Sequence, residues 1–212
     1  EKVTSIIKQG ENLEGFLFMA TKKGTIKKTA VKEYLNIRAN GLITIKLDAG
    51  DELKWIQETT GNNDVVISTS AGQAMRFNEQ DVRAMGRSAR GVRGIRLRPK
   101  DEIVGMDVIR DEKQKLLVMS ANGYGKATLA ENFPAHKRGG VGIKVASVTT
   151  KTGPIVAVHT LDPLAKEVIM MSTKGQAIRV AIKEIPTQGR ATQGVRIMRL
   201  NDGDTVASIG VV

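Results

Sequence analysis

The stretch "MSANGYGKAT" (119–128) carries the pattern that decides the fold. A short apolar segment leads into a polar turn that ends in glycine, and a second extended segment follows directly. Glycine tolerates the positive φ of tight turns, so the pattern predicts a two-stranded β-hairpin. The same pattern recurs about every 50 residues, in "ATKKGTIKKT" (20–29), "STSAGQAMRF" (68–77) and "MSTKGQAIRV" (171–180). The predicted turn glycines are Gly24, Gly72, Gly123 and Gly175.

A second motif follows each hairpin and begins at a glycine. Its copies are "NGLITIKL" (40–47), "RGVRGIRL" (90–97), "RGGVGIKV" (138–145) and "QGVRIMRL" (193–200). Alternate residues of a strand face opposite sides, so alignment on the first glycine predicts two apolar columns on the core face. These columns are Ile45, Ile95, Ile143 and Met198, and Leu47, Leu97, Val145 and Leu200. The position between them is basic in every copy: Lys46, Arg96, Lys144 and Arg199. An outward position that favours any long polar side chain is the alternative interpretation.

A third motif closes each repeat, in "DELKWI" (51–56), "DEIVGM" (101–106), "GPIVAV" (153–158) and "DTVASI" (204–209). The chain begins with "EKVTSI", which matches this motif, so we expect residues 1–12 to be the closing strand of a preceding repeat in a longer protein. The remaining chain divides into four expected blades, 13–60, 61–110, 111–162 and 163–212, within one repeat domain, 1–212. Units of this length must stack to bury their sheets. The prediction is therefore an all-β, propeller-like array of four-stranded antiparallel blades. The spans 31–39 and 184–192 are expected to be loops with at most one helical turn.

The composition indicates a partner of opposite charge. The chain has 33 Lys and Arg against 22 Asp and Glu, a net charge of +11, and no cysteine. Such a surface fits a nucleic acid, an anionic membrane or simple solubility. No basic amphipathic helix and no apolar run of ~20 residues is evident, which favours nucleic acid over membrane. The lack of cysteine excludes thiolate zinc sites and disulfides.

The cations recur at similar places in each repeat, which predicts a continuous curved stripe. Lysine and arginine beside glycine-rich backbone can follow phosphates without reading base sequence. Aromatic residues are only 3% of the chain, which favours duplex DNA over stacked single strands. The candidate DNA-binding residues are Lys27, Lys28, Arg38, Lys46, Arg76, Arg87, Arg90, Arg93, Arg96, Lys126, Lys137, Arg138, Lys144, Arg179, Arg190, Arg196 and Arg199.

No catalytic or metal site is predicted. His136 and His159 lack a second ligand at metal-binding spacing. The segment "GYGKAT" (123–128) lacks the spacing of a P-loop, so a hairpin turn is the better interpretation. The acidic pairs that begin at Asp51 and Asp101 recur at strand starts, which indicates roles in turns or at sheet edges and not in acid–base chemistry.

Four segments together resemble one known family: "FMATKKGTIKKT" (18–29), "VRAMGRSARGVRGIRL" (82–97), "NGYGKAT" (122–128) and "QGRATQGVRIMRL" (188–200). They are similar to the C-terminal domain of the bacterial DNA gyrase A protein. The resemblance implies a β-pinwheel with strands exchanged between blades, which wraps duplex DNA around a basic outer rim. It implies no catalytic site and no cofactor in this chain. ATP and Mg would bind elsewhere in the parent ATP-dependent type II topoisomerase, an isomerase.

The resemblance also implies partners and a location. The partners are duplex DNA, the N-terminal region of the gyrase A protein and the gyrase B protein, with no membrane. The location is the bacterial cytoplasm, in association with the nucleoid, and the chain alone would be a monomer. The segment "HKRGGVG" (136–142) resembles a degenerate gyrase A-box, with His136 in place of Gln and Val141 in place of a basic residue. The intact box would lie in an earlier blade. The alternatives are the corresponding domain of the topoisomerase IV A protein and a basic propeller that acts as a protein-interaction scaffold.

Overall fold

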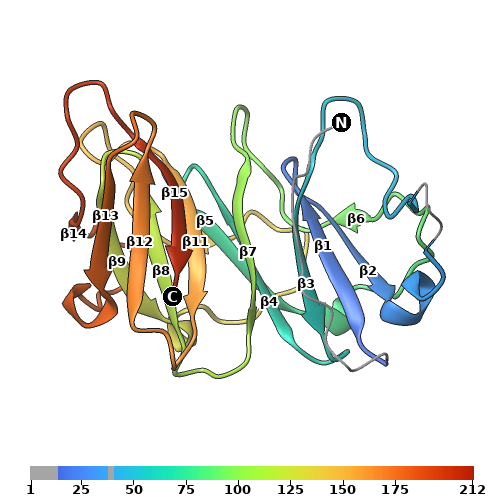
Figure 1. Cartoon of the computed structure of the whole chain (residues 1–212). Coiled ribbons are helices and arrows are strands. Elements are labelled where there is room, and N and C mark those ends of the chain that lie inside the picture. The colour runs from blue at the N-terminus through green and yellow to red at the C-terminus, as the bar shows by residue number, and fades with distance from the viewer. Residues whose placement is uncertain (1–13, 38–40) are drawn as a thin grey trace.

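The described part of the chain forms an array of β-sheets with four short 3-10 turns. The computed structural model describes residues 14–37 and 41–212, so the expected strand at 1–12 and the candidate Arg38 lie outside the described residues. Four antiparallel sheets follow one another in chain order (Figure 1). The predicted all-β, propeller-like class is confirmed. None of the helical segments in the described ranges is long and apolar enough to cross a membrane.

Each sheet is built on a hairpin and a closing strand that pairs with the hairpin's first strand. The hairpins are β1 (Phe16–Thr21) with β2 (Thr25–Ala30), β4 (Asp64–Thr69) with β5 (Gln73–Asn78), β8 (Lys115–Ser120) with β9 (Tyr124–Leu129), and β12 (Glu167–Ser172) with β13 (Ala177–Ala181). The closing strands are β3 (Leu53–Thr59), β7 (Ile103–Ile109), β11 (Ile155–Leu161) and β15 (Val206–Val211). The four predicted turn glycines have φ between +78° and +86°, which confirms the hairpins.

The first three sheets gain a fourth strand from the following repeat. β6 (Val92–Arg93) pairs with β2, β10 (Ile143–Lys144) pairs with β5, and β14 (Val195–Arg196) pairs with β9. These strands belong to the second sequence motif, so the expected strand exchange is present. Residues 41–47 form no strand in the described part of the chain.

The exchanged strands correct the alignment of the second motif. In each, the basic residue pairs with the residue directly after a hairpin glycine: Arg93 with Thr25, Lys144 with Gln73, and Arg196 with Tyr124. The third-repeat counterpart of Gly91 and Gly194 is therefore Gly142, and the predicted alignment on Gly139 is wrong by three residues. Arg138-Gly139 in the third repeat has the same sequence as Arg90-Gly91 in the second, and this match hid the offset.

The corrected register also divides the predicted cation column in two. Arg93, Lys144 and Arg196 occupy one position. Lys46, Arg96 and Arg199 occupy another, three residues later, where the third repeat has Ser147. The buried position between these columns holds Ile45, Ile95, Ala146 and Met198. The second predicted core column is only partly correct, since Leu47 is exposed.

The hydrophobic core lies between successive blades. One cluster joins the first two blades, where the Phe18 and Phe77 rings pack with centroids 6.0 Å apart. Equivalent clusters join the second blade to the third and the third to the fourth, around Phe133 and Met198 respectively. Both faces of an internal blade are thus covered by its neighbours.

A short 3-10 turn follows each hairpin: η1 (Val31–Tyr34), η2 (Glu79–Asp81), η3 (Ala130–Asn132) and η4 (Ile182–Glu184).

The predicted turn role of the recurring carboxylates is confirmed. Asp51 accepts hydrogen bonds from Thr21 Oγ1 (2.7 Å) and from the Lys23 backbone N–H (2.9 Å). Asp101 and Asp204 accept equivalent bonds at the second and fourth hairpin turns. Each closing motif that begins with such a carboxylate therefore fixes the tip of its own hairpin.

Candidate nucleic-acid interface

The second-motif segments join into one ribbon, which we call the rim and define as residues 41–47, 86–97, 137–148 and 189–200. Backbone bonds link each rim segment to the next: Lys46 N–H to Ala89 O (3.2 Å), Arg96 N–H to Gly140 O (2.7 Å), and Ser147 N–H to Thr192 O (3.1 Å). The donor and acceptor occupy the same repeat positions each time in the corrected register. The rim is therefore continuous across all four repeats.

The hairpin turns form backbone hydrogen bonds with the rim. The backbone N–H groups of Gly94, Val145 and Ile197 donate to the carbonyls of Gly24, Gly72 and Gly123, each at 2.9 Å. The approach is close, because a Cβ at Gly142 would lie 2.6 Å from Ala74 O, and the φ of Gly142 is +75°. Only glycine combines this φ with such an approach without strain.

Two sets of cations project from the rim. Arg93, Lys144 and Arg196 lie on the exchanged strands and are exposed. Lys46, Arg96 and Arg199 follow three residues later and are largely accessible as well. The first repeat departs from the pattern, since it has Ile43, 73% exposed, at the first position. In the second and fourth rim segments, two cations thus flank a buried apolar residue, Ile95 or Met198.

A third set, Arg87, Arg138 and Arg190, precedes the rim glycines. Arg138 donates from Nη1 to Arg93 O and from Nε to Asp81 O, both at 3.0 Å. Arg190 Nη1 donates to Lys144 O at 3.4 Å, the equivalent acceptor one repeat later. The guanidinium groups of Arg138 and Arg190 thus cross-link successive rim segments while they add positive charge to them. Beside Arg138, Lys137 is exposed.

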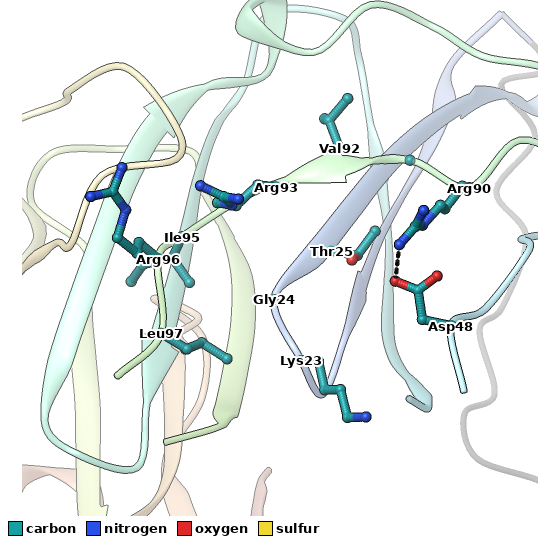
Figure 2. Close-up of a pocket in the computed structure, with 11 residues that line it drawn as sticks. Lys23, Gly24, Thr25, Asp48, Arg90, Val92, Arg93, Ile95, Arg96 and Leu97 are labelled. Carbon is teal, nitrogen blue, oxygen red and sulfur yellow. Dashed lines mark hydrogen bonds and ion pairs between the residues drawn. The ribbon is translucent and has the colours of Figure 1, made fainter. Parts of the chain in front are cut away.

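A cationic depression of about 660 Å³ lies between the first hairpin turn and the following rim segment (Figure 2). Lys23 extends from the turn, while Arg93 and Arg96 extend from the chain at and after β6. At the other end, Arg90 forms an ion pair with Asp48 at 2.5 Å. Four basic side chains and one carboxylate line this depression, so an anionic group is the ligand that it fits.

Four candidates from the hairpin strands are buried, and the expectation that they belong to an exposed stripe is wrong. Lys27, Lys28, Arg76 and Lys126 are 0%, 5%, 8% and 1% exposed, respectively. Lys28 Nζ donates to Glu79 O (2.8 Å), and Arg76 binds Asp64, Glu112 and the carbonyls of Ala130 and Phe133. Lys28 and Arg76 lie on the sheet face that packs on the next blade, whereas Lys27 and Lys126, one strand position earlier, lie on the opposite face. Alternation within a single repeat cannot reveal which neighbour covers either face. Arg179, the equivalent of Arg76 in the last blade, is exposed and pairs with Glu167 at 2.8 Å.

Lys27 and Lys126 occupy equivalent positions three residues after a hairpin glycine. Burial lowers the pKa of each ammonium group to about 8, and the nearby Arg87 charge contributes for Lys27. Both are held by carbonyl oxygens of rim loops. The charge and spacing of Lys27 and Lys126 predict DNA contacts. The sequence of a single repeat does not show the loops that cover these residues.

Known proteins that are similar to this chain share its four-repeat, propeller-like organisation. The family described as DNA gyrase C-terminal domain, beta-propeller, matches residues 15–59, 63–110, 114–162 and 166–212. The DNA gyrase A protein of Staphylococcus epidermidis (strain ATCC 12228 / FDA PCI 1200) is 39% identical over 207 residues, which cover 97% of the chain and 23% of that protein. The chain thus spans about a quarter of the length of the curated relatives it matches.

Two solved structures share the fold. A structure described as the DNA gyrase A C-terminal domain aligns with TM-score 0.84 and 25% identity, over 96% of this chain and 68% of that chain. A crystal structure of the C-terminal domain of DNA topoisomerase IV aligns with TM-score 0.89 and 24% identity, over 97% of this chain and 64% of that chain.

The fold and rim define a propeller-like repeat domain whose blades exchange strands and display cations along one edge. The four family matches together cover most of the chain. The chain belongs to the DNA gyrase C-terminal domain family, as the sequence resemblance predicted.

Proposed function

We propose that this chain binds duplex DNA along the rim, independently of base sequence, and bends the duplex as it follows the blades. The continuous rim, with exposed cations at repeated positions, is the observation that carries the proposal. The proposed contacts on the rim are Lys46, Arg87, Arg90, Arg93, Arg96, Lys137, Arg138, Lys144, Arg190, Arg196 and Arg199. The exposed Arg179 on β13, outside the rim, is a further proposed contact.

The chemistry of the rim favours phosphates over base edges. Its cations are spread over four repeats, and long basic side chains reach phosphate oxygens without reading sequence. The large aromatic side chains Phe18, Phe77 and Phe133 are buried between blades, where they cannot stack on bases. Smoothly bending a 20–30 bp site costs on the order of 1–6 kcal/mol, which several distributed phosphate contacts can offset.

We assign the chain a geometric role in a larger enzyme. Its relatives are DNA gyrase A proteins, so we propose that it orients DNA for strand passage and supercoiling by an ATP-dependent type II topoisomerase in the bacterial cytoplasm. In this proposal the rest of the gyrase A protein, together with the gyrase B protein, carries out DNA cleavage and ATP hydrolysis with Mg, and this domain needs no cofactor. On its own the 212-residue chain is proposed to be a monomer.

The test is a salt-titrated binding assay on random-sequence duplex, combined with fluorescence transfer between the duplex ends. Each phosphate contact contributes about 0.9 to the slope of log K against log salt. With four to eight contacts, a slope of roughly −4 to −7 is expected, together with increased end-to-end transfer on binding. A flat salt response would refute DNA binding, and a steep response without increased transfer would refute bending.

Topoisomerase IV is the second candidate parent enzyme, and its C-terminal domain has the TM-score of 0.89. At 24% identity that similarity shows the fold alone, whereas the 39% identity to a DNA gyrase A protein favours gyrase. A basic protein-interaction scaffold is the alternative from another class, and the flat salt response described above would favour it.

A further inference from the structure

Two lysines are buried inside the array at equivalent places, and their ammonium groups bind the rim. Lys126 Nζ donates to Gly189 O (2.7 Å), Arg190 O (2.8 Å) and Thr192 Oγ1 (3.1 Å). Lys27 Nζ donates to Thr44 O (2.6 Å) and to Arg87 O. In the corrected register, the Arg87 and Arg190 carbonyls are the same repeat position. One contact, from a hairpin lysine to the rim loop of the next blade, is thus made twice.

We infer that Lys27 and Lys126 are positioning residues for the rim: each fixes, from inside, the loop of the next blade that carries the exposed cations. The inference rests on the proposed DNA binding. It gives these two lysines a role that does not require them to touch DNA, in place of the direct contact that their charge suggested.

The second blade shows what replaces the lysine. Its equivalent residue is Met75, which is buried and packs toward Gly140, where a Cβ would lie 2.9 Å from Met75 Cε. Methionine offers no N–H donor. The loop of the third repeat is held instead by Arg138, which donates to Asp81 O and Arg93 O at 3.0 Å. Arg190 makes the counterpart of the bond to Arg93 O, so the bond from Arg138 Nε to Asp81 O is the one that the loop of the third repeat has in addition.

A neutral side chain at position 126 would remove three hydrogen bonds from the loop: Gly189 O would keep Thr192 as a donor, whereas Arg190 O would lose the ammonium group. A lysine ammonium group has three N–H donors, and Lys126 directs them to three acceptors in one loop. These acceptors are only partly buried, so the variant removes the bonds that fix the loop and leaves the loop freer to rearrange. Movement of residues 188–193 would displace Arg190 from its place on the rim. The expected loss is therefore in DNA affinity and local order more than in the blade cores.

The experiment compares Lys126→Met with Met75→Leu and Lys113→Gln in the 212-residue chain. Met75→Leu alters the equivalent buried position without a change of charge, and Lys113→Gln removes one exposed charge outside the rim. We expect Lys126→Met to lose amide-exchange protection in residues 188–193 and to weaken binding to random-sequence duplex at least about threefold, roughly 0.7 kcal/mol. Both controls should bind within about twofold of the parent, roughly 0.4 kcal/mol.

Specific outcomes would overturn the inference. If Lys126→Met keeps its loop protection, or weakens binding no more than Lys113→Gln does, Lys126 does not position the rim. If the parent chain itself fails to bind duplex DNA, the proposed function fails, while loss of loop protection in the variant would still show the structural tie. Should Lys126→Met not fold, Lys27→Met tests the same contact in another blade, through the protection of residues 86–91. The reciprocal variant Met75→Lys should increase protection of residues 138–140, and no increase there would count against the inference.

Discussion

The corrected register predicts which cations follow the DNA, and a triple substitution tests it. Arg93, Lys144 and Arg196 occupy one structural position on three exchanged strands, and all three are exposed. Replacing them together with glutamine keeps long polar side chains and removes three positive charges. The blades should remain intact, because the strand pairing uses backbone groups alone.

The expected magnitude comes from counterion release. Each phosphate contact contributes about 0.9 to the slope of log K against log salt, so three lost contacts should reduce the slope by about 2.7. Arg196 also donates to the Tyr124 hydroxyl at 3.0 Å, which holds its guanidinium near the rim surface. Fluorescence anisotropy on a random-sequence duplex, measured from low to moderate salt, gives the slope directly.

The matched control is the triple variant Lys113→Gln, Lys166→Gln and Lys183→Gln. These lysines lie outside the rim, and their replacement changes the net charge by the same amount. We expect the slope of the control to stay within about 1 of the parent. If both triple variants reduce the slope equally, the effect is one of net charge, and the rim is not the DNA path. If the rim variant leaves the slope unchanged, the register argument fails as a guide to DNA contacts.

Three further predictions concern stability. Gly142→Ala should reduce the free energy of unfolding by about 1–3 kcal/mol in chemical denaturation, because its Cβ would lie 2.6 Å from Ala74 O at φ +75°; Gly189→Ala, with nothing within 4 Å, should cost less than about 1 kcal/mol. At Asp204, burial opposes the charged form, but hydrogen bonds from the fourth hairpin turn outweigh it and lower the pKa to about 2. Asp204 therefore stabilises the fold above pH 3.8, and this contribution should disappear as pH falls toward 2, while Asp204→Asn should show a smaller acid loss. Burial lowers the pKa of Lys126 from 10.5 to about 8, so between pH 8 and 10.5 the unfolded chain binds more protons than the folded chain. The free energy of unfolding of the parent should therefore rise relative to that of Lys126→Met as pH rises from 8 to 10.5. If this difference does not change with pH, the ammonium group is not buried.

Much of the fold could be predicted from the sequence because it repeats. The hairpin glycines require a positive φ, and four copies at a regular interval identify a stack of blades without any knowledge of contacts. The recurring Asp51 and Asp101 were likewise placed correctly at turns, since a carboxylate at a strand start readily accepts backbone N–H bonds. These features depend on short-range geometry that each repeat contains in full.

The candidate site was predicted less well, because its residues depend on the neighbouring blade. Lys126 and the exposed Arg196 look alike in the sequence, as each is a basic residue close to a glycine. Lys126 is buried, and its ammonium group is covered by the rim loop of the next repeat. Arg196 is exposed on β14, the strand that the next repeat adds to the sheet. Charge and spacing within one repeat do not distinguish the two. The signal that could have separated them is Met75, an apolar residue at the same hairpin position, which indicates burial.

The third repeat explains why the rim tolerates irregular sequence. Alignment on Arg138-Gly139 shifts the third repeat by three residues from its structural register. Gly142 nevertheless approaches the hairpin backbone as closely as Gly91 and Gly194 do in their repeats. The backbone bonds that join the rim do not depend on side chains, so Ser147 can replace a cation without breaking the ribbon. Where Met75 replaces the buried lysine, Arg138 makes an additional hydrogen bond to Asp81 O. Backbone pairing thus maintains the path of the rim, and the cations vary around it, as expected of a surface that binds a regular polyanion without reading its sequence.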